Sequence, residues 1–117
     1  MAGRTADDPA LDLMTTTPFQ EVLLDEETVG QLFFDVRHAA ELVAVIEKGP
    51  NERRAREPST TLDALDAAHA AFTRRELVGV QLRYRFGGEE WWDTLTHTAS
   101  GVRLIRISHT RTLATEP

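Results

Sequence analysis

The chain has 117 residues, of which 41% are hydrophobic and 27% are charged, and it contains no cysteine. A chain of this length forms one hydrophobic core, so we expect one domain. Without cysteine there are no disulfides, thiolate nucleophiles or cysteine-ligated metal sites, and a reducing cytoplasm is the expected compartment. The net charge of -6 disfavours nonspecific nucleic-acid binding. No apolar run approaches the roughly 20 residues of a membrane span, so no membrane partner is expected.

The N-terminal part of the chain is expected to contribute little to the core. Residues 1–16 predict a flexible lead, because an acidic stretch and a run of threonines flank only a short apolar patch. Residues 17–117 then form the predicted domain. Thr17-Pro18-Phe19-Gln20 has a capping residue, a proline at the first helical position and a glutamine at the third. This pattern predicts a short helical turn through Leu24, with an edge strand as the alternative.

A long helix is predicted from Asp25 to Lys48. Asp25 can cap its first turn, and Gly49-Pro50 is a typical stop signal. One stripe at helical spacing is apolar and should face the core: Val29, Leu32, Phe33, Val36, Ala40 and Val43.

The opposite side of this predicted helix carries a second line that is partly apolar. Its members are Phe34, His38, Glu41 and Val45. A helix in a small monomer does not need a second apolar line. We therefore interpret it as a candidate homodimer or partner contact, with scattered surface apolar residues as the alternative.

A second helix is predicted to start near Thr60 and to run through an alanine-rich segment to Arg75. Thr60 and Asp63 have the spacing of a capping box. The apolar line of this helix is Leu62, Leu65, His69 and Phe72. His69 is thus expected on the buried face, as a neutral histidine with one hydrogen bond.

From Leu77 the apolar period changes from 3.6 to 2, which predicts strands. Gly87-Gly88 is a two-residue hairpin signal that separates the first strand from a second at Glu89–Thr98. A turn at Ala99–Gly101 leads to a third strand at Val102–Ser108. The predicted fold class is α+β, with two amphipathic helices on one face of a three-stranded antiparallel meander, to which an N-terminal strand is a possible addition.

The hairpin turn determines which side chains share a face of this sheet. A two-residue turn pairs Arg83 with Trp92 and Leu82 with Asp93, which directs Trp92 outward and Asp93 inward. A three-residue turn pairs Arg83 with Asp93 and directs Trp91 outward instead. Either way, arginines and one indole are expected on the solvent face. The predicted binding residues are Arg83, Arg85, Trp91 or Trp92, and Arg103 or Arg106.

Well-specified catalytic motifs are absent from the sequence, which favours a non-catalytic protein. Asp35-x-x-His38 and Asp66-x-x-His69 have a spacing that suits dimetal sites, but the two histidines are expected on differently oriented helix faces. No metal or other cofactor is therefore expected. The low-ranked acid–base candidates are His97, Asp93 and His69.

The leading functional hypothesis is a small binding or accessory protein. Its Arg/Trp sheet face would bind an acidic protein partner or a small anionic ligand. The alternatives are a small enzyme that uses His97, Asp93 and His69 in a pocket between sheet and helices, and a single-stranded nucleic-acid binder that conflicts with the acidic net charge. Ordinary cross-strand pairing of arginine with glutamate and tryptophan also explains such a face without any binding role.

Overall fold

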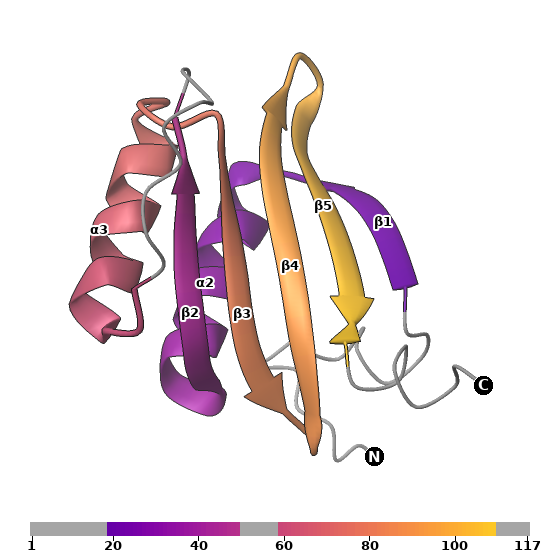
Figure 1. Ribbon diagram of the computed structural model, residues 1–117. Coiled ribbons are helices and arrows are strands. Elements are labelled where there is room, and N and C mark those ends of the chain that lie inside the picture. Colours follow the sequence, from indigo (N-terminus) through magenta and orange to yellow (C-terminus); the bar gives the residue numbers. More distant parts are fainter. Residues whose placement is uncertain (1–18, 50–58, 110–117) are drawn as a thin grey trace.

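The computed structural model describes residues 19–49 and 59–109 as two helices on one face of a five-stranded antiparallel sheet (Figure 1). The elements in chain order are β1 (Phe19–Leu24), α2 (Glu26–Ala39), β2 (Glu41–Lys48), α3 (Leu62–Thr73), β3 (Gly79–Phe86), β4 (Glu89–Thr98) and β5 (Gly101–Ser108). The strand order is β1-β5-β4-β3-β2. The α+β class is confirmed, but the sheet has five strands rather than three. The lead expected at 1–16 lies outside the described residues.

The segment expected as a helical turn or an edge strand is the edge strand β1. It pairs antiparallel with β5 along its whole length. Val22 and Leu24 pack against the core, whereas Leu23 is exposed, as the alternation of a half-buried strand requires. No helix in the described ranges is long and apolar enough to cross a bilayer.

The prediction of one long helix to Lys48 is wrong beyond Ala39. The start is as expected, since Oδ1 of Asp25 accepts a hydrogen bond from the backbone N–H of Thr28 at 2.8 Å. The backbone then becomes extended at Ala40, and β2 pairs with β3 through a bulge between Leu42 and Ala44. The β-branched residues of this segment suit a strand, and no glycine or proline marks the helix end.

This correction separates the residues of the predicted second apolar line. Phe34 and His38 are on α2, with ring centroids 4.3 Å apart, and Phe34 is 57% exposed. Glu41 and Val45 lie on β2, and Val45 is part of the core. The four side chains therefore do not form one helical face, because two belong to α2 and two to β2.

The second helix, α3, agrees closely with the prediction. Its cap is Thr61 rather than Thr60, and Oγ1 of Thr61 accepts from the backbone N–H of Ala64 at 3.0 Å. Leu65 and Phe72 are buried as expected, whereas Leu62 is exposed. An ion pair between Arg37 and Asp66, at 3.3 Å, connects α2 to α3.

The pairing of β3 with β4 is the one that a two-residue turn requires. Gly87 and Gly88 both have positive φ, at 65° and 81°, so glycine is the residue type that fits this turn. Arg83 pairs with Trp92 and Leu82 with Asp93. The three-residue alternative is therefore wrong.

The pairing of β4 with β5 directs Arg106 inward, against the expectation that it could join the solvent face. Thr98 pairs with Gly101, and the ladder then places Arg106 opposite Asp93. Both residues lie on the helix-covered face of the sheet, and both have 0% exposure. The buried carboxylate that the sequence placed among apolar neighbours therefore has a cationic partner.

Asp93, Arg106 and Tyr84 form a closed polar cluster inside the core. Nε and Nη2 of Arg106 donate to the two carboxylate oxygens of Asp93 at 2.9 and 2.8 Å, and the Tyr84 hydroxyl donates to Oδ2 at 2.6 Å. Burial alone would lower the pKa of the Arg106 guanidinium, but the attraction of Asp93 raises it above its ordinary value. Burial raises the pKa of the Tyr84 hydroxyl, which stays protonated and donates.

Removing one member of this cluster should be strongly destabilising. In Arg106→Met the Asp93 carboxylate stays buried without its cation, and the free energy of unfolding should fall by about 3–5 kcal/mol. Arg103→Met is the matched control on the same strand, because the Arg103–Glu21 pair is exposed and should cost under about 1 kcal/mol. Urea denaturation measures both. Similar decreases in the free energy of unfolding for the two variants would contradict the conclusion that the buried cluster is needed for stability.

Candidate functional site

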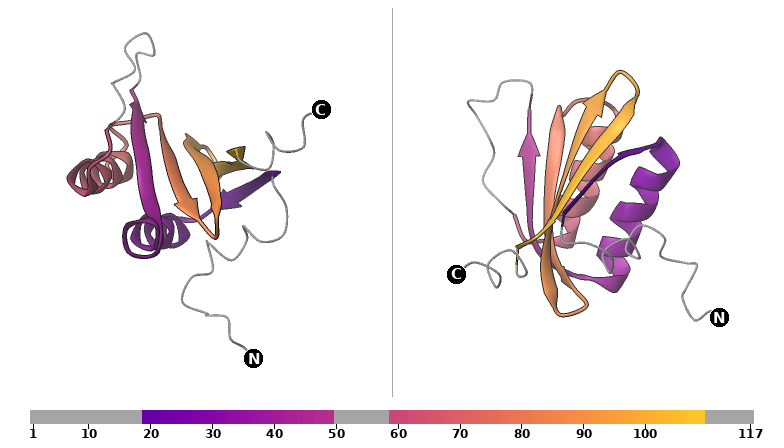
Figure 2. Two further views of the ribbon diagram at one scale, coloured as in Figure 1. Left: turned by 60° about the horizontal axis from the view of Figure 1, so that its bottom comes forward. Right: turned by 90° about the vertical axis from the view of Figure 1, so that its right-hand side faces the viewer.

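The candidate site is the outer face of the sheet, which lies opposite α2 and α3 (Figure 2). Side chains of β3, β4 and β5 alternate between the buried core and this face. The central residues of the outer face are Gln81, Arg83, Arg85, Glu90, Trp92, Thr94, Arg103, Ile105 and Ile107. The structure thus brings together three of the predicted arginines and one of the two predicted tryptophans.

Two side chains stack on the indole of Trp92. The guanidinium carbon of Arg83 lies 3.9 Å from the ring centroid, and the His109 ring is nearly parallel to the indole at 4.5 Å. Arg83 reaches the ring from β3 and His109 from the end of β5, the strands on either side of β4. We call Arg83, Trp92 and His109 the indole stack. It holds the half-buried indole between two neighbours.

Hydrogen bonds hold the indole stack in place along the sheet. Nε of Arg83 donates to Oε1 of Gln81 at 2.8 Å, and Nε2 of Gln81 donates to the Thr94 hydroxyl at 3.0 Å. The indole N–H of Trp92 donates to a carboxylate oxygen of Glu90 at 2.8 Å. The orientation of the Arg83 guanidinium is therefore determined by an aromatic face on one side and an amide at Nε.

The terminal nitrogens of Arg83 differ from those of the other outer-face arginines. Within residues 19–49 and 59–109, no carboxylate lies within ion-pair distance of Arg83. Arg85 lies 3.6 Å from Glu41 and 3.7 Å from Glu90, and Arg103 lies 3.3 Å from Glu21. Among the described residues of this face, Arg83 is therefore the arginine whose guanidinium is held in a fixed orientation without a carboxylate partner.

Two predicted binding residues are not on this face. Trp91 is 1% exposed and belongs to the core, where its indole N–H donates to the Phe86 carbonyl at 3.2 Å. Arg106 is the buried partner of Asp93. Both corrections follow from the strand pairing. Side chains alternate along β4, so Trp91 points inward because its neighbour Trp92 points outward. The tight turn after Thr98 places Arg106 opposite Asp93, which also points inward.

His109 is a residue of the site that the sequence reasoning missed. Ile107 pairs with Trp92, so His109 lies two residues further on the same face and diagonal to the indole. The alternation of β5 could have indicated this position, but only once the turn between β4 and β5 was known.

The three acid–base candidates do not form one site. Asp93 is held in the buried ion pair, and His97 is four residues further along β4. The His97 ring stacks on Phe72 at 3.9 Å, whereas His69 stacks on Phe33 between the helices at 4.4 Å. No two of these groups share a hydrogen bond in the described part of the chain. A common catalytic mechanism therefore has no geometric basis.

The two Asp-x-x-His units also remain apart. Asp35 accepts a hydrogen bond from Gln31 at 2.8 Å, and Asp66 pairs with Arg37. His38 contacts Phe34 at the surface. Across the described ranges, no group of three or more histidines and carboxylates is arranged to hold a metal ion.

Exposed apolar side chains accompany the charged residues of the outer face. Ile107 pairs with Trp92 and is 37% exposed, and the half-buried Ile105 lies two residues before it on β5. Leu23 of β1 pairs with Arg103 and is also exposed. The outer face is therefore a mixture of apolar area and guanidinium groups, a composition enriched in protein interfaces.

Comparison with protein-family models, with curated proteins and with solved structures finds no significant match. Functional inference for this chain therefore depends on the geometry described above.

His69 should titrate at lower pH than an exposed histidine. Burial lowers the pKa of its imidazole below 6.5, and the Asp66 carboxylate raises it in part. Because the folded pKa is lowered, the stabilising contribution of neutral His69 is present above about pH 6.5 and declines as the pH falls through the folded pKa. NMR titration of the imidazole should give a midpoint under 6.5 and a still lower one in Asp66→Asn. A midpoint above 6.5, or an increase in Asp66→Asn, would contradict this environment.

Proposed function

We propose that this chain is a non-catalytic binding protein whose outer sheet face receives an acidic segment of a partner protein. A carboxylate of that segment binds the terminal nitrogens of Arg83, and its apolar neighbours pack beside Trp92 on Ile105 and Ile107. The observation that carries the proposal is Arg83, which is stacked, hydrogen-bonded at Nε and without a carboxylate partner among the described residues.

A guanidinium that is held in a fixed orientation by stacking and by one hydrogen bond suits carboxylate recognition. Its two terminal nitrogens present a planar pair of donors, and bidentate arginine–carboxylate pairs are among the stronger hydrogen-bonded contacts. Because the stack and Gln81 already restrict the side chain, less conformational entropy is lost when a partner binds. The neighbouring Arg85 and Arg103 have glutamate partners and contribute less net attraction.

The shape of the face favours a protein segment over a small anion. Small-molecule sites are concave and cover most of their ligand, whereas neither helix of the described residues covers this face of the sheet (Figure 2). One pocket lies between the start of α2 and the end of α3, and another lies between α2 and α3 beside Phe34 and His69; neither is lined by a residue of the indole stack. An indole beside an arginine is typical of protein-contact hot spots.

The alternative functions have less support. An enzyme that uses His97, Asp93 and His69 would need these groups to meet, and Asp93 is fully occupied by Arg106 and Tyr84. A platform for stacked bases would need a free indole face, and Trp92 already has Arg83 and His109 stacked on it.

Peptide selection tests the proposal directly. Random-peptide phage selection against the full chain should enrich sequences in which Asp or Glu lies beside an apolar residue. A synthetic peptide from that pool should bind Arg83→Gln at least about tenfold more weakly than wild type, a loss of about 1.4 kcal/mol or more. Trp92→Ala should weaken binding in the same direction, because it removes both the apolar contact and the support of Arg83. Fluorescence polarisation measures the affinities.

Arg103→Gln is the matched control, since it removes a guanidinium from the same face but one that already has Glu21 as its partner. Its affinity should stay within about twofold of wild type, because an exposed, paired charge contributes little. Circular dichroism checks that all variants fold. Enriched peptides without acidic residues, or an Arg83→Gln affinity equal to that of Arg103→Gln, would reject the proposed function.

A further inference from the structure

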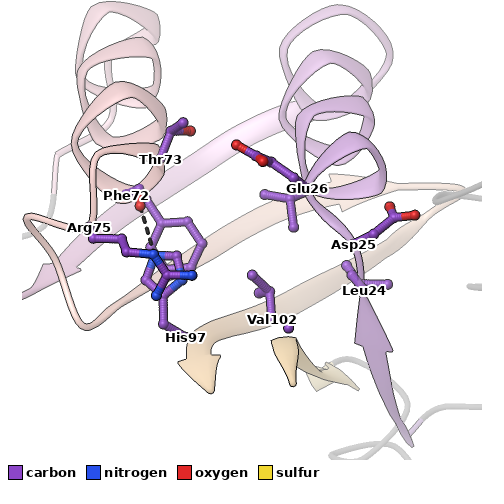
Figure 3. A pocket seen from close by; sticks show the side chains of 10 residues that line it. Leu24, Asp25, Glu26, Phe72, Thr73, Arg75, His97 and Val102 are labelled. Carbon is purple, nitrogen blue, oxygen red and sulfur yellow. Dashed lines mark hydrogen bonds between the residues drawn. The ribbon is translucent and has the colours of Figure 1, made fainter. Parts of the chain in front are cut away.

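A separate pocket lies on the other side of the sheet, between the start of α2 and the end of α3 (Figure 3). Its volume is about 140 Å³, enough for several water molecules or one small organic molecule. The floor is apolar and consists of Leu24, Val29, Phe72 and Val102. Charged side chains of opposite sign line the two sides, and none of them belongs to the outer face.

One wall carries Arg75, which is held in an unusual backbone conformation. Its φ is 63°, and it is the only residue other than glycine with positive φ in the described part of the chain. It ends α3 in the arrangement in which glycine is preferred, with its N–H bonded to the Phe72 carbonyl at 3.0 Å and the next N–H bonded to Ala71 at 2.9 Å. Backbone preference would favour glycine here, so we look for a function of the Arg75 side chain that explains the arginine.

The Arg75 guanidinium has no carboxylate partner among residues 19–49 and 59–109. The nearby Glu76 pairs with Arg74 instead: Nε and Nη2 of Arg74 donate to the two carboxylate oxygens of Glu76 at 2.8 and 3.0 Å. Arg75 thus brings an unneutralised positive charge to the rim of the pocket.

The opposite wall is negative. Asp25 is the cap of α2, and its hydrogen bonds with Thr28 lower the pKa of its carboxyl, which is therefore ionised at neutral pH. Glu26 follows it, and Figure 3 shows the Glu26 carboxylate directed across the pocket toward Thr73 of α3. A cationic group in the gap would meet Glu26 on one side and the hydroxyl of Thr73 on the other.

His97 forms part of the same lining and can report on occupancy. A carbonyl oxygen only accepts hydrogen bonds, so the 2.7 Å contact with Phe72 requires that Nε2 of His97 carries the proton. Nδ1 of the same ring has no hydrogen-bond partner among the described residues. A ligand in the pocket would change the surroundings of this ring and its resonances.

We infer that the pocket binds a small zwitterion of the α-amino acid class. Its carboxylate pairs with Arg75, its ammonium group lies between Glu26 and Thr73, and a short apolar side chain contacts Val102 and Phe72. Among the described residues, the charged lining consists of Arg75 on one wall and Asp25 and Glu26 on the other, so a simple anion or a simple cation would leave one wall without a partner. A zwitterion satisfies both walls with one molecule.

Titration with L-alanine, followed by NMR of the full chain, tests this inference. Saturable shifts are expected at Thr73, His97 and Val102, with a Kd of about 1 mM, as fits so few ligand atoms. Propionate and ethylammonium carry one charge each and should bind at least about tenfold more weakly. Propionate binding as tight as that of L-alanine, or no saturable shift with any of the three probes, would overturn the zwitterion site.

Two variants separate binding from stability. Arg75→Gly should raise the melting temperature, because glycine relieves the positive φ, and should weaken L-alanine binding at least about tenfold. Glu26→Gln should weaken binding without that gain in stability. Arg74→Gln is the matched control from the adjacent position and should bind L-alanine as wild type does. A higher melting temperature with unchanged L-alanine affinity in Arg75→Gly would contradict the assignment.

The outer face provides a further comparison, because the two proposed sites share no residue. Arg83→Gln should leave L-alanine binding unchanged, and Arg75→Gly should leave acidic-peptide binding unchanged. Loss of both activities in either variant would reject two separate sites.

Discussion

The ion pair between Asp93 and Arg106 is the constraint on which the arrangement of the sheet depends. Both groups are fully buried, and each would be costly in the core without the other. They meet only if β4 and β5 pair in the observed way, because a slip of one residue would move one of them to the opposite face. Buried ion pairs often add little net stability, so we attribute to this one a role in specifying the strand pairing. Tyr84 extends the same constraint to β3.

The composition of the outer face follows from what the core requires. Side chains alternate along a strand, so an inward Asp93 places Trp92 outward, and an inward Arg106 places Ile105 and Ile107 outward. The solvent face then acquires its own network, which runs from Glu90 through the indole stack to Gln81 and Thr94. The buried polar cluster of Asp93 on one side of the sheet and the oriented guanidinium of Arg83 on the other thus both follow from the way in which β4 pairs with its neighbours.

Local patterns in the sequence predict the parts of the structure that depend on neighbouring residues. The alternation of β3 and the two glycines after it predict the hairpin and limit its pairing to two registers, of which the structure has the one with a two-residue turn. The capping threonine predicts the start of α3 to within one residue. The end of α2 is missed because no glycine or proline separates Ala39 from Glu41. The apolar residues of β2 also happen to continue the helical spacing of α2, and only pairing with β3 distinguishes the two.

The functional positions are harder to predict because they depend on contacts between distant segments. The arginine and tryptophan content of the face is visible in the alternation, but the burial of Arg106 and the position of His109 depend on the turn between β4 and β5. The pocket joins the start of α2, the end of α3 and the last hairpin, which no single periodicity connects. The positive φ of Arg75 has no sequence signal, since the residue that favours this conformation is glycine.

Collisional quenching by acrylamide tests most directly whether the strands pair as this account requires. The chain has two tryptophans, so Trp91→Phe and Trp92→Phe each leave one indole to report. Trp92 alone should be quenched more strongly than Trp91 alone, because Trp92 is half-buried on the outer face and Trp91 is 1% exposed in the core. Trp91 alone should also emit at shorter wavelength. The reverse order would mean that β4 is shifted by one residue, with Asp93 outside, Arg106 unpaired and no indole stack on the outer face.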